Sequence, residues 1–272
     1  MSPRASVTEA LVAALEARLT PTEQAVVETL DRVRLATGAQ LERLHFVGEG
    51  TSHTVARRAR RTLTRLVGLR VLSRLNRRIG GVRAGSAGYV YALDVAGQRL
   101  ASACGPAGGA RIRRPWTPGG TFVAHTLAVT DLYVRLREAE RTGDLELTAF
   151  DAEPAAWRRF TGLGGSATWL KPDAFVRVAS GEFEHFTFVE VDRATQSAPA
   201  LARKLAVYRR YHATGREQDR FGLFPRVVLL VPSEARKDVA ARVCAAQPSD
   251  SWPLWRVAPY DDALTALTGG QP

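Results

Sequence analysis

The sequence predicts an α/β protein in which N-terminal helices and a hairpin precede a mixed β-sheet that is flanked by helices. Three observations support this fold class. Helical periodicity dominates the chain before Gly68, short apolar runs typical of strands appear after Leu145, and helical segments separate the later strands. Strands that alternate with helices favour a sheet with helices packed on its faces.

The first predicted helices cover most of the chain up to Leu44. Residues 7–19 repeat apolar side chains at helical spacing. A second helix begins at Thr20, because a capping Thr is followed by Pro21 in the first turn and by Glu23 at the capping-box position. It extends to about Arg34, and a short helix follows over residues 38–44.

A basic helix and a hairpin come next. Residues 53–67 have an apolar helical stripe, and two strands at residues 71–75 and 89–93 follow them. Helices followed by a hairpin is the element order of a winged helix-turn-helix, with residues 53–67 as the recognition helix and the hairpin as the wing. The arginines that fall mostly off the stripe or in the hairpin are Arg57, Arg58, Arg60, Arg61, Arg65, Arg77, Arg78 and Arg83.

The distribution of charge indicates a nucleic-acid partner for this region. The chain has 38 Lys and Arg against 27 Asp and Glu, a formal net charge of +11, and His53 to Gly85 contains ten Arg and no acidic residue. Arg binds phosphate through two parallel donors, and clustered Arg is typical of a DNA-binding face. We therefore predict that these arginines bind double-stranded DNA, mostly through backbone phosphates. The alternative is a solvated basic helix in a protein-binding domain.

Composition excludes several other classes of protein. No apolar run is long enough to span a bilayer, and the N-terminus lacks the features of a signal peptide. Cys104 and Cys244 form neither a disulfide framework nor a zinc-binding spacing, so the sequence predicts a cytoplasmic protein. The motifs of serine hydrolases, P-loop proteins, zinc proteases and dinucleotide-binding proteins are absent from the sequence.

A Gly- and Pro-rich stretch divides the chain. Residues 101–120 hold no period, so we predict a linker there, between a DNA-binding domain of residues 1–100 and a second domain of residues 121–272. The second domain begins with a helix over residues 122–141 that has His125 in its first turns. A strand over residues 145–150 and a variable insertion follow.

Three carboxylates come together in the hairpin that we expect at the centre of the second domain. Two Val- and Phe-rich strands flank a turn near Gly181, so Asp173 falls almost opposite Glu190, while Glu190 and Asp192 share one face. Carboxylates that close repel each other, and a divalent cation would offset their charge. The sequence therefore predicts a Mg²⁺ or Mn²⁺ site.

The helix after this hairpin brings further side chains toward the same place. Ser197 is its predicted cap, and Lys204, Tyr208 and Tyr211 lie along one of its faces. A buried strand over residues 226–231, a further helix and an edge strand complete the predicted mixed sheet.

The acidic residues also carry a family resemblance. Pro172-Asp173 followed by Glu190-Val191-Asp192 resembles the acidic motif of the PD-(D/E)xK restriction-endonuclease-like superfamily. The run EVDRATQS, with Lys204 and Tyr208 on the next helix, resembles the replication-relaxation family of actinobacterial plasmids and mobile elements, as does HTLAVTDLY around His125. That family is related to conjugative relaxases with a winged helix before a nuclease-like domain. The sequence departs from the superfamily at Asp192, where Lys is usual.

The resemblance implies a restriction-endonuclease-like sheet and a relaxase- or nickase-like protein of plasmid replication or transfer. In such a protein Asp173 and Glu190 would bind Mg²⁺ or Mn²⁺ for phosphodiester cleavage, and Lys204 would replace the missing lysine. Asp192 is a third candidate ligand. The partner would be an origin-like duplex, bound by a homodimer if the target is an inverted repeat. The accessory candidates are His125, Arg193, Gln196 and Tyr208.

Three alternatives remain open at this point. One is a regulator that binds a protein partner through its C-terminal domain. The protein could be a non-catalytic DNA-binding regulator of replication, transfer or transcription whose nuclease fold is degenerate. Its carboxylates would then form salt bridges with Arg177, Arg193 and Lys204. A covalent relaxase mechanism would need a nucleophile such as Tyr208 or Tyr211, although packing or hydrogen bonding is the more frequent role of a helical Tyr.

Overall fold

The computed structural model describes residues 7–48, 50–78, 88–104 and 118–270 of the chain. The chain divides into two compact units, Met1–Val134 and Arg135–Pro272, and the division falls within helix α6 (Gly120–Thr142). No helix in the described ranges combines the length and the apolar character that crossing a bilayer requires.

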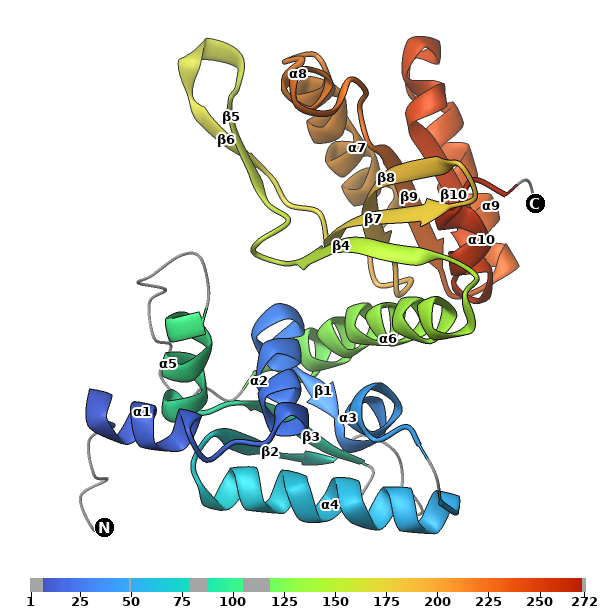
Figure 1. Cartoon of the computed structure of the whole chain (residues 1–272). Helices are drawn as coiled ribbons and strands as arrows, with labels where there is room; N and C mark the ends of the chain where they lie inside the picture. Colours follow the sequence, from blue (N-terminus) through green and yellow to red (C-terminus); the bar gives the residue numbers. More distant parts are fainter. Residues whose placement is uncertain (1–6, 49, 79–87, 105–117, 271–272) are drawn as a thin grey trace. The chain divides into compact units, whose positions relative to one another are not determined.

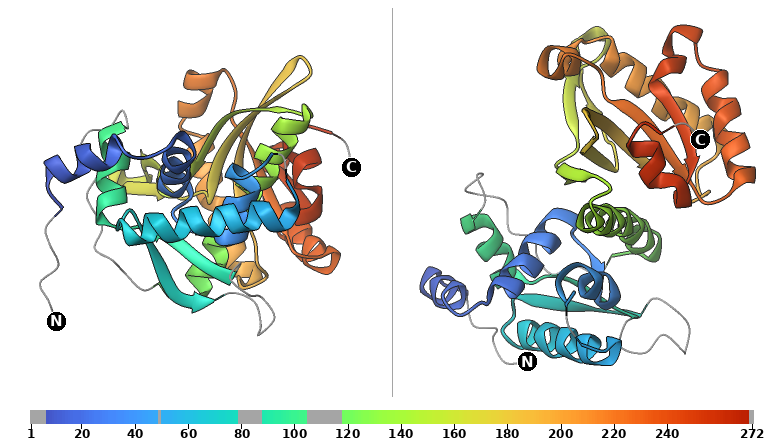
Figure 2. Two further views of the ribbon diagram at one scale, coloured as in Figure 1. Left: turned by 60° about the horizontal axis from the view of Figure 1, so that its bottom comes forward. Right: turned by 45° about the vertical axis from the view of Figure 1, so that its right-hand side comes forward.

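Unit 1 consists of helices around a small sheet. Its three strands pair antiparallel in the order β1–β3–β2, and β2 contacts α4, as Figures 1 and 2 show from several directions. Before α6, the elements are α1 (Glu9–Glu16), α2 (Pro21–Val33), β1 (Ala36–Thr37), α3 (Gly38–His45), α4 (Ser52–Gly68), β2 (Leu72–Arg78), β3 (Tyr89–Leu93) and α5 (Val95–Cys104).

Side-chain caps begin helices α1 to α4 of unit 1. The Thr20 hydroxyl accepts a hydrogen bond from the Glu23 amide, and the Glu23 carboxylate accepts one from the Thr20 amide at 2.9 Å, so the predicted capping box at α2 is confirmed. Thr37 and Gln40 form the same arrangement at α3. Thr51 caps α4, which is the basic helix that the sequence predicted.

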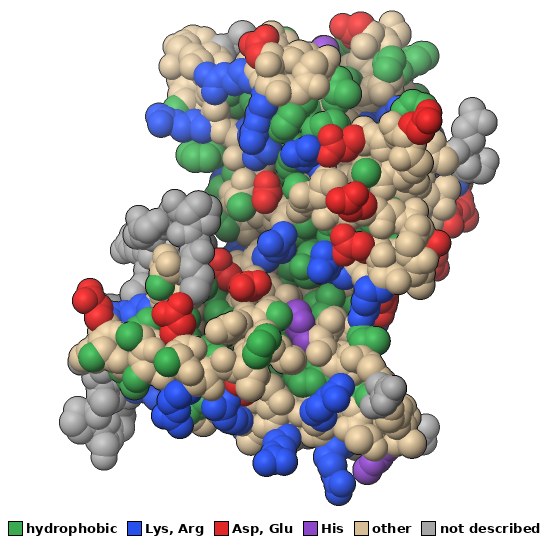
Figure 3. Space-filling view, viewed as in Figure 1, with side chains coloured by type: hydrophobic (Ala, Val, Ile, Leu, Met, Phe, Trp, Pro, Cys, Tyr) green, Lys and Arg blue, Asp and Glu red, His purple; other side chains and the backbone are tan. Residues whose placement is uncertain are grey.

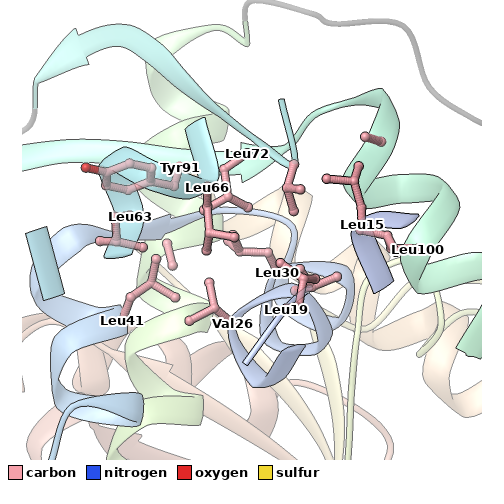
Figure 4. Close-up of a cluster of buried hydrophobic side chains, with 14 of the residues drawn as sticks. Leu15, Leu19, Val26, Leu30, Leu41, Leu63, Leu66, Leu72, Tyr91 and Leu100 are labelled. Carbon is pink, nitrogen blue, oxygen red and sulfur yellow. The ribbon is translucent and has the colours of Figure 1, made fainter. Parts of the chain in front are cut away.

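An apolar core fixes which side of α4 faces solvent. Leu63 and Leu66 of α4 are buried against Leu30, Leu41 and other side chains in the cluster of Figure 4. Because the apolar residues of α4 recur at helical spacing, its arginines are left on the opposite side. The packing of the unit 1 core therefore leaves the arginines of α4 exposed to solvent.

Unit 2 is built on a five-stranded mixed sheet with the order β10–β9–β8–β7–β4. Strand β8 pairs antiparallel with β7 and parallel with β9, and β9 pairs parallel with β10. The elements after α6 are β4 (Glu146–Ala152), β5 (Arg158–Thr161), η2 (Leu163–Gly165), β6 (Ala167–Leu170), β7 (Ala174–Ser180), β8 (Phe183–Val191), α7 (Ala198–His212), α8 (Arg216–Phe221), β9 (Arg226–Val231), α9 (Glu234–Ala245), η3 (Ser249–Leu254), β10 (Trp255–Pro259), η4 (Tyr260–Asp262) and α10 (Ala263–Leu267).

Helices α7 and α9 contact each other and pack on one face of this sheet. Phe188 of β8 lies in their shared core with Leu201, Leu205 and Tyr208 of α7. Side chains alternate along a strand, so Glu190 points to the same face as Phe188. Helix α7 thus covers the end of β8 that carries Glu190.

The register of the central hairpin agrees with the turn predicted near Gly181. Ser180 pairs with Phe183 and Ala174 pairs with Val189, so Asp173, one residue before β7, comes next to Glu190. This agreement follows from the fixed two-residue period of a strand once the turn is located.

Three parts of the fold differ from the sequence prediction. Helix α5 occupies residues 95–104, the last four of which we had assigned to the linker; residues 105–117 of that predicted linker lie outside the described residues. The insertion before Asp173 forms a two-stranded hairpin, β5–β6, and α8 was not expected. These elements are short, and short elements give weak periodic patterns.

Candidate functional site

Four predicted site residues come together on unit 2. The Lys204 ammonium donates a hydrogen bond to Glu190 Oε2 and lies 4.0 Å from Asp173 Oδ1. The Tyr208 hydroxyl donates to Glu190 Oε1 at 2.6 Å. The backbone amide of Val191 donates to Asp173 Oδ2 at 2.7 Å, which fixes the second carboxylate against β8.

The local sequence explains how α7 reaches the carboxylates. The Ser197 side chain caps α7 by accepting from the Ala200 amide, and Pro199 lies in the first turn. Lys204 and Tyr208 are four residues apart, so they share the inward face of the helix. Tyr208 is fully buried, whereas the Lys204 side chain keeps 26% of its surface exposed at the margin of the site.

Glu190 and Lys204 differ in how their surroundings shift their pKa values. Burial raises the pKa of Glu190 to about 8; the Asp173 charge adds to this rise, while Lys204 and Tyr208 only partly oppose it. Burial acts to lower the pKa of Lys204, but the Glu190 and Asp173 carboxylates raise it overall. The site therefore holds a protonated lysine beside two carboxylates, one of which exchanges a proton near neutral pH.

Asp192 lies outside this cluster, although the sequence predicted that it would belong to it. Strand β8 ends at Val191, so the alternation that would place Asp192 beside Glu190 no longer applies. Asp192 Oδ2 accepts from Arg236 Nε at 2.6 Å, and Oδ1 accepts from the Ala194 amide at 2.7 Å. Across the described ranges no three His, Cys, Asp or Glu side chains lie close enough to hold a metal ion, so the predicted meeting of three carboxylates is wrong.

The accessory candidates separate into different surroundings. Arg193 and Gln196 are exposed in the loop before α7, where the Gln196 carbonyl accepts from Arg236 Nη2 at 2.8 Å. His125 lies on the part of α6 that belongs to unit 1, not in the unit that holds the carboxylates.

The predicted salt-bridge partners of the carboxylates are only partly found. Arg177 pairs with Glu184 at 2.6 Å, and Lys204 is the predicted cation that pairs with Glu190. Arg236, the partner of Asp192, was missed because nothing local in the sequence links two residues so far apart. Tyr211 is buried and donates to Glu217 at 2.6 Å, so its hydroxyl, like that of Tyr208, is engaged inside the fold.

The arginines of α4 form an exposed basic face on unit 1. Figure 3 shows Lys and Arg side chains gathered over this helix, opposite its buried residues. Arg58 donates to the Phe46 carbonyl at 3.2 Å, and Arg65 pairs with the buried carboxylate of Glu23. Arg60 bonds the Ala56 carbonyl of its own helix at 3.1 Å. All five predicted arginines of this helix are exposed, namely Arg57, Arg58, Arg60, Arg61 and Arg65.

The remaining predicted DNA contacts lie in or beyond β2. Arg77 and Arg78 end that strand, and Arg83 lies outside the described residues.

Comparison with known proteins gives one match. A family model described as Replication-relaxation matches residues 27–227, which span α4, the hairpin with Asp173 and Glu190, and the helix with Lys204. Neither a curated protein nor a solved structure matches the chain.

Proposed function

Because the chain belongs to the replication-relaxation family, which implies a role in plasmid replication or relaxation, we propose that unit 1 binds duplex DNA and that unit 2 cleaves a phosphodiester bond. The observation that supports cleavage is the meeting of Asp173, Glu190 and Lys204. Two carboxylates, one just before a strand and one on the adjacent strand, beside a lysine are the elements that a restriction-endonuclease-like site requires. In this chain α7 supplies the lysine that the usual motif places two residues after the Glu.

The donor set fits a hard divalent cation. Mg²⁺ and Mn²⁺ prefer oxygen ligands, and Mg²⁺ is commonly held by one or two carboxylates while waters complete its shell. Asp173 and Glu190 would hold such an ion, with no third carboxylate needed. When bound, it would offset phosphate charge and lower the pKa of a water molecule.

The other residues act on the substrate or on the carboxylates. Lys204 stays protonated and would stabilise the negative charge that develops on the phosphate during cleavage. Tyr208 is a positioning residue, because its hydroxyl holds Glu190 Oε1 from the buried side. Burial of Tyr208 argues against its use as a nucleophile, so we favour attack by water over a covalent tyrosine intermediate.

DNA binding is assigned to α4 of unit 1. The order α2, β1, α3, α4, β2, β3 is that of a winged helix, in which α4 is the recognition helix. Arg57 and Arg61 are four residues apart and exposed, and among the described residues neither guanidinium has a partner. We infer that they bind backbone phosphates and thereby orient the duplex.

A second function, a DNA-binding regulator without cleavage, is favoured by one specific observation. Both oxygens of Glu190 already have donors, Lys204 and Tyr208. A carboxylate satisfied in this way is stable without a metal ion. The nuclease-like unit would then serve as a scaffold.

A nicking assay separates the two functions. Supercoiled plasmid containing the family's origin-like sequence is incubated with the full chain, with and without Mn²⁺, and the open-circular product is measured. We expect Mn²⁺-dependent nicking by the wild type and none by Asp173→Asn or Glu190→Gln, with circular dichroism confirming that both variants fold. Nicking by both variants would exclude this site, and binding without nicking by the wild type would favour the regulator.

A further inference from the structure

The hairpin β5–β6 has one anchored face and one exposed face. On the anchored face Phe160 and Leu170 are buried in the core of unit 2, and Arg158 Nε donates to Glu217 at 2.9 Å. Figure 1 shows the hairpin extending from the ends of β4 and β7. Its position in unit 2 is therefore fixed from one side, and the other side is left to solvent.

The exposed face alternates aromatic and basic side chains. Arg159 pairs across the strands with Trp169, and both are exposed, Trp169 by 48% of its surface. The Lys171 ammonium lies 4.6 Å from the centre of the Trp157 ring, and Trp157 meets Trp169 edge to face at 6.4 Å. We call these four residues, Trp157, Arg159, Trp169 and Lys171, the hairpin face.

Stabilisation of the hairpin explains the contact between Lys171 and Trp157 but not the exposure of Trp169 and Arg159. The Lys171–Trp157 contact is a cation–π pair that joins the two ends of the hairpin. Trp169 and Arg159, in contrast, point to solvent, and within the described residues neither Arg159 nor Lys171 has a carboxylate partner. An exposed indole between two uncompensated cations has the chemistry of a surface on which a nucleobase stacks while its phosphates bind nearby.

The hairpin face lies close to the carboxylate site along the chain. Trp169 precedes Asp173 by four residues, so their Cα atoms are at most about 14 Å apart. Pro172 between them is buried, which limits the conformations of this short connection. A base stacked on Trp169 would therefore belong to a nucleotide near the phosphate held at Asp173 and Glu190.

We propose that the hairpin face binds an unpaired base of DNA beside the carboxylate site. In a duplex both faces of a base are covered by its neighbours, so stacking on Trp169 needs a base that has left the helix. Negative supercoiling favours such opening. The proposal rests on the proposed function for the identity of the ligand as DNA, and it specifies locally single-stranded DNA as the form bound by unit 2.

Binding measured without cleavage tests this proposal. The full chain is titrated, in EDTA, into a fluorescein-labelled oligothymidylate and into a duplex of equal length, and anisotropy is recorded. We expect Trp169→Ala to weaken single-strand binding roughly tenfold, as loss of one base–aromatic stack does, and duplex binding less than about twofold. Trp169→Phe should keep most of the affinity, because it keeps an aromatic ring.

Trp252→Ala is the matched control, since Trp252 is another exposed tryptophan of unit 2, at 52% exposure. It should leave both affinities unchanged. The proposal is overturned if Trp169→Ala binds single strands like the wild type, if it loses single-strand and duplex binding equally, or if the wild type binds no single strand.

This outcome is independent of cleavage. A protein that does not nick plasmid but loses single-strand binding in Trp169→Ala would keep this proposal and reject the nuclease. If the wild type nicks plasmid but Trp169→Ala binds single strands as well as the wild type, the nuclease proposal is kept and this proposal is rejected.

Discussion

The two units place their charged side chains in opposite surroundings. Unit 1 exposes the arginines of α4, and in its described part Arg57 and Arg61 have no acidic partner. In unit 2, by contrast, three acidic side chains with little exposed surface pair with cations. Exposed cations attract a polyanion over a distance and add little to stability, whereas buried pairs offset each other's charge inside the fold. The buried pairs are Glu190 with Lys204, Asp192 with Arg236, and Glu217 with Arg158.

One buried pair in unit 1 makes the contrast clearer. Burial acts to raise the pKa of Glu23, but hydrogen bonds from Arg65 and Thr20 lower it overall. Burial raises the pKa of Glu190 to about 8, and its two donors do not reverse the effect. The pKa of a glutamate is thus lowered at Glu23, which caps a helix, and raised at Glu190, which lies near the end of a strand. This difference is what we expect if the Glu23 pair is structural and the Glu190 pair has the role proposed above.

The largest effect should come from breaking the Glu190 pair on its cationic side. Lys204→Gln removes the charge that would stabilise the phosphate, so Mn²⁺-dependent plasmid nicking should fall on the order of a hundredfold. Arg177→Gln, which breaks the Arg177–Glu184 pair of the same sheet, is the control and should change nicking only a few-fold. Equal losses in both variants would show that the pairs act alike and would remove the distinction between them.

A somewhat smaller effect is expected from pH. Glu190 must lose its proton to bind a cation, and its pKa is raised to about 8, so Mn²⁺ affinity should rise by up to tenfold per pH unit below pH 8 and level off above it. Calorimetry in two buffers of different ionisation enthalpy measures both the affinity and the proton released.

Tyr208→Phe sharpens this test. The Tyr208 hydrogen bond acts to lower the pKa of Glu190, so its loss should move the midpoint to higher pH. Glu190→Gln should abolish the proton release. An affinity that stays constant from pH 6 to 8 would contradict the assignment of Glu190 as the titrating ligand.

The exposed cations of unit 1 should have an intermediate effect on DNA affinity. Arg57→Ala combined with Arg61→Ala should weaken duplex binding about tenfold and reduce the salt slope by about 2, one for each lost phosphate contact. Arg220→Gln with Arg242→Gln removes the same charge from exposed positions of unit 2. If this control lowers the slope as much, net charge and not the α4 face governs binding.

The smallest effect is on stability. Replacing both members of the Glu190 pair, with Glu190→Gln and Lys204→Met, should change the free energy of unfolding by no more than about 1 kcal/mol, because a buried ion pair is often no better than neutral groups. Glu23→Ala with Arg65→Met should cost about 1–2 kcal/mol, since it also removes the capping box of α2. Denaturant unfolding of the full chain measures both, and a larger loss in the first variant would identify Glu190 as structural.

Much of the site could be predicted because its determinants are local. The turn at Gly181 and the strand period fix Asp173 next to Glu190, and helical spacing fixes Lys204 and Tyr208 on one face of α7. The family match over residues 27–227 confirms the resemblance that these residues carried. The alternation of strand-like and helical segments predicted a mixed sheet flanked by helices, but it did not fix the number of strands.

The rest depends on packing between distant segments. Arg236 reaches Asp192 only because α9 lies beside the end of β8, and no periodic pattern records that contact. The hairpin β5–β6 was read as an insertion because its strands are short and mix Arg, Phe and Trp. The glycines at its turn, Gly162, Gly164 and Gly165, were the available indication, since two of them have the positive φ angles that turns require.

The loop from Asp192 to Ser197 is ordered when the chain folds. Ala194 has a φ of 56° and its amide donates to Asp192, while Arg236 binds both Asp192 and the Gln196 carbonyl. These bonds restrain the conformation of an exposed segment. The start of α7, and with it the position of Lys204, is thus set while the chain folds, so DNA binding as proposed above would not carry the entropic cost of ordering this segment.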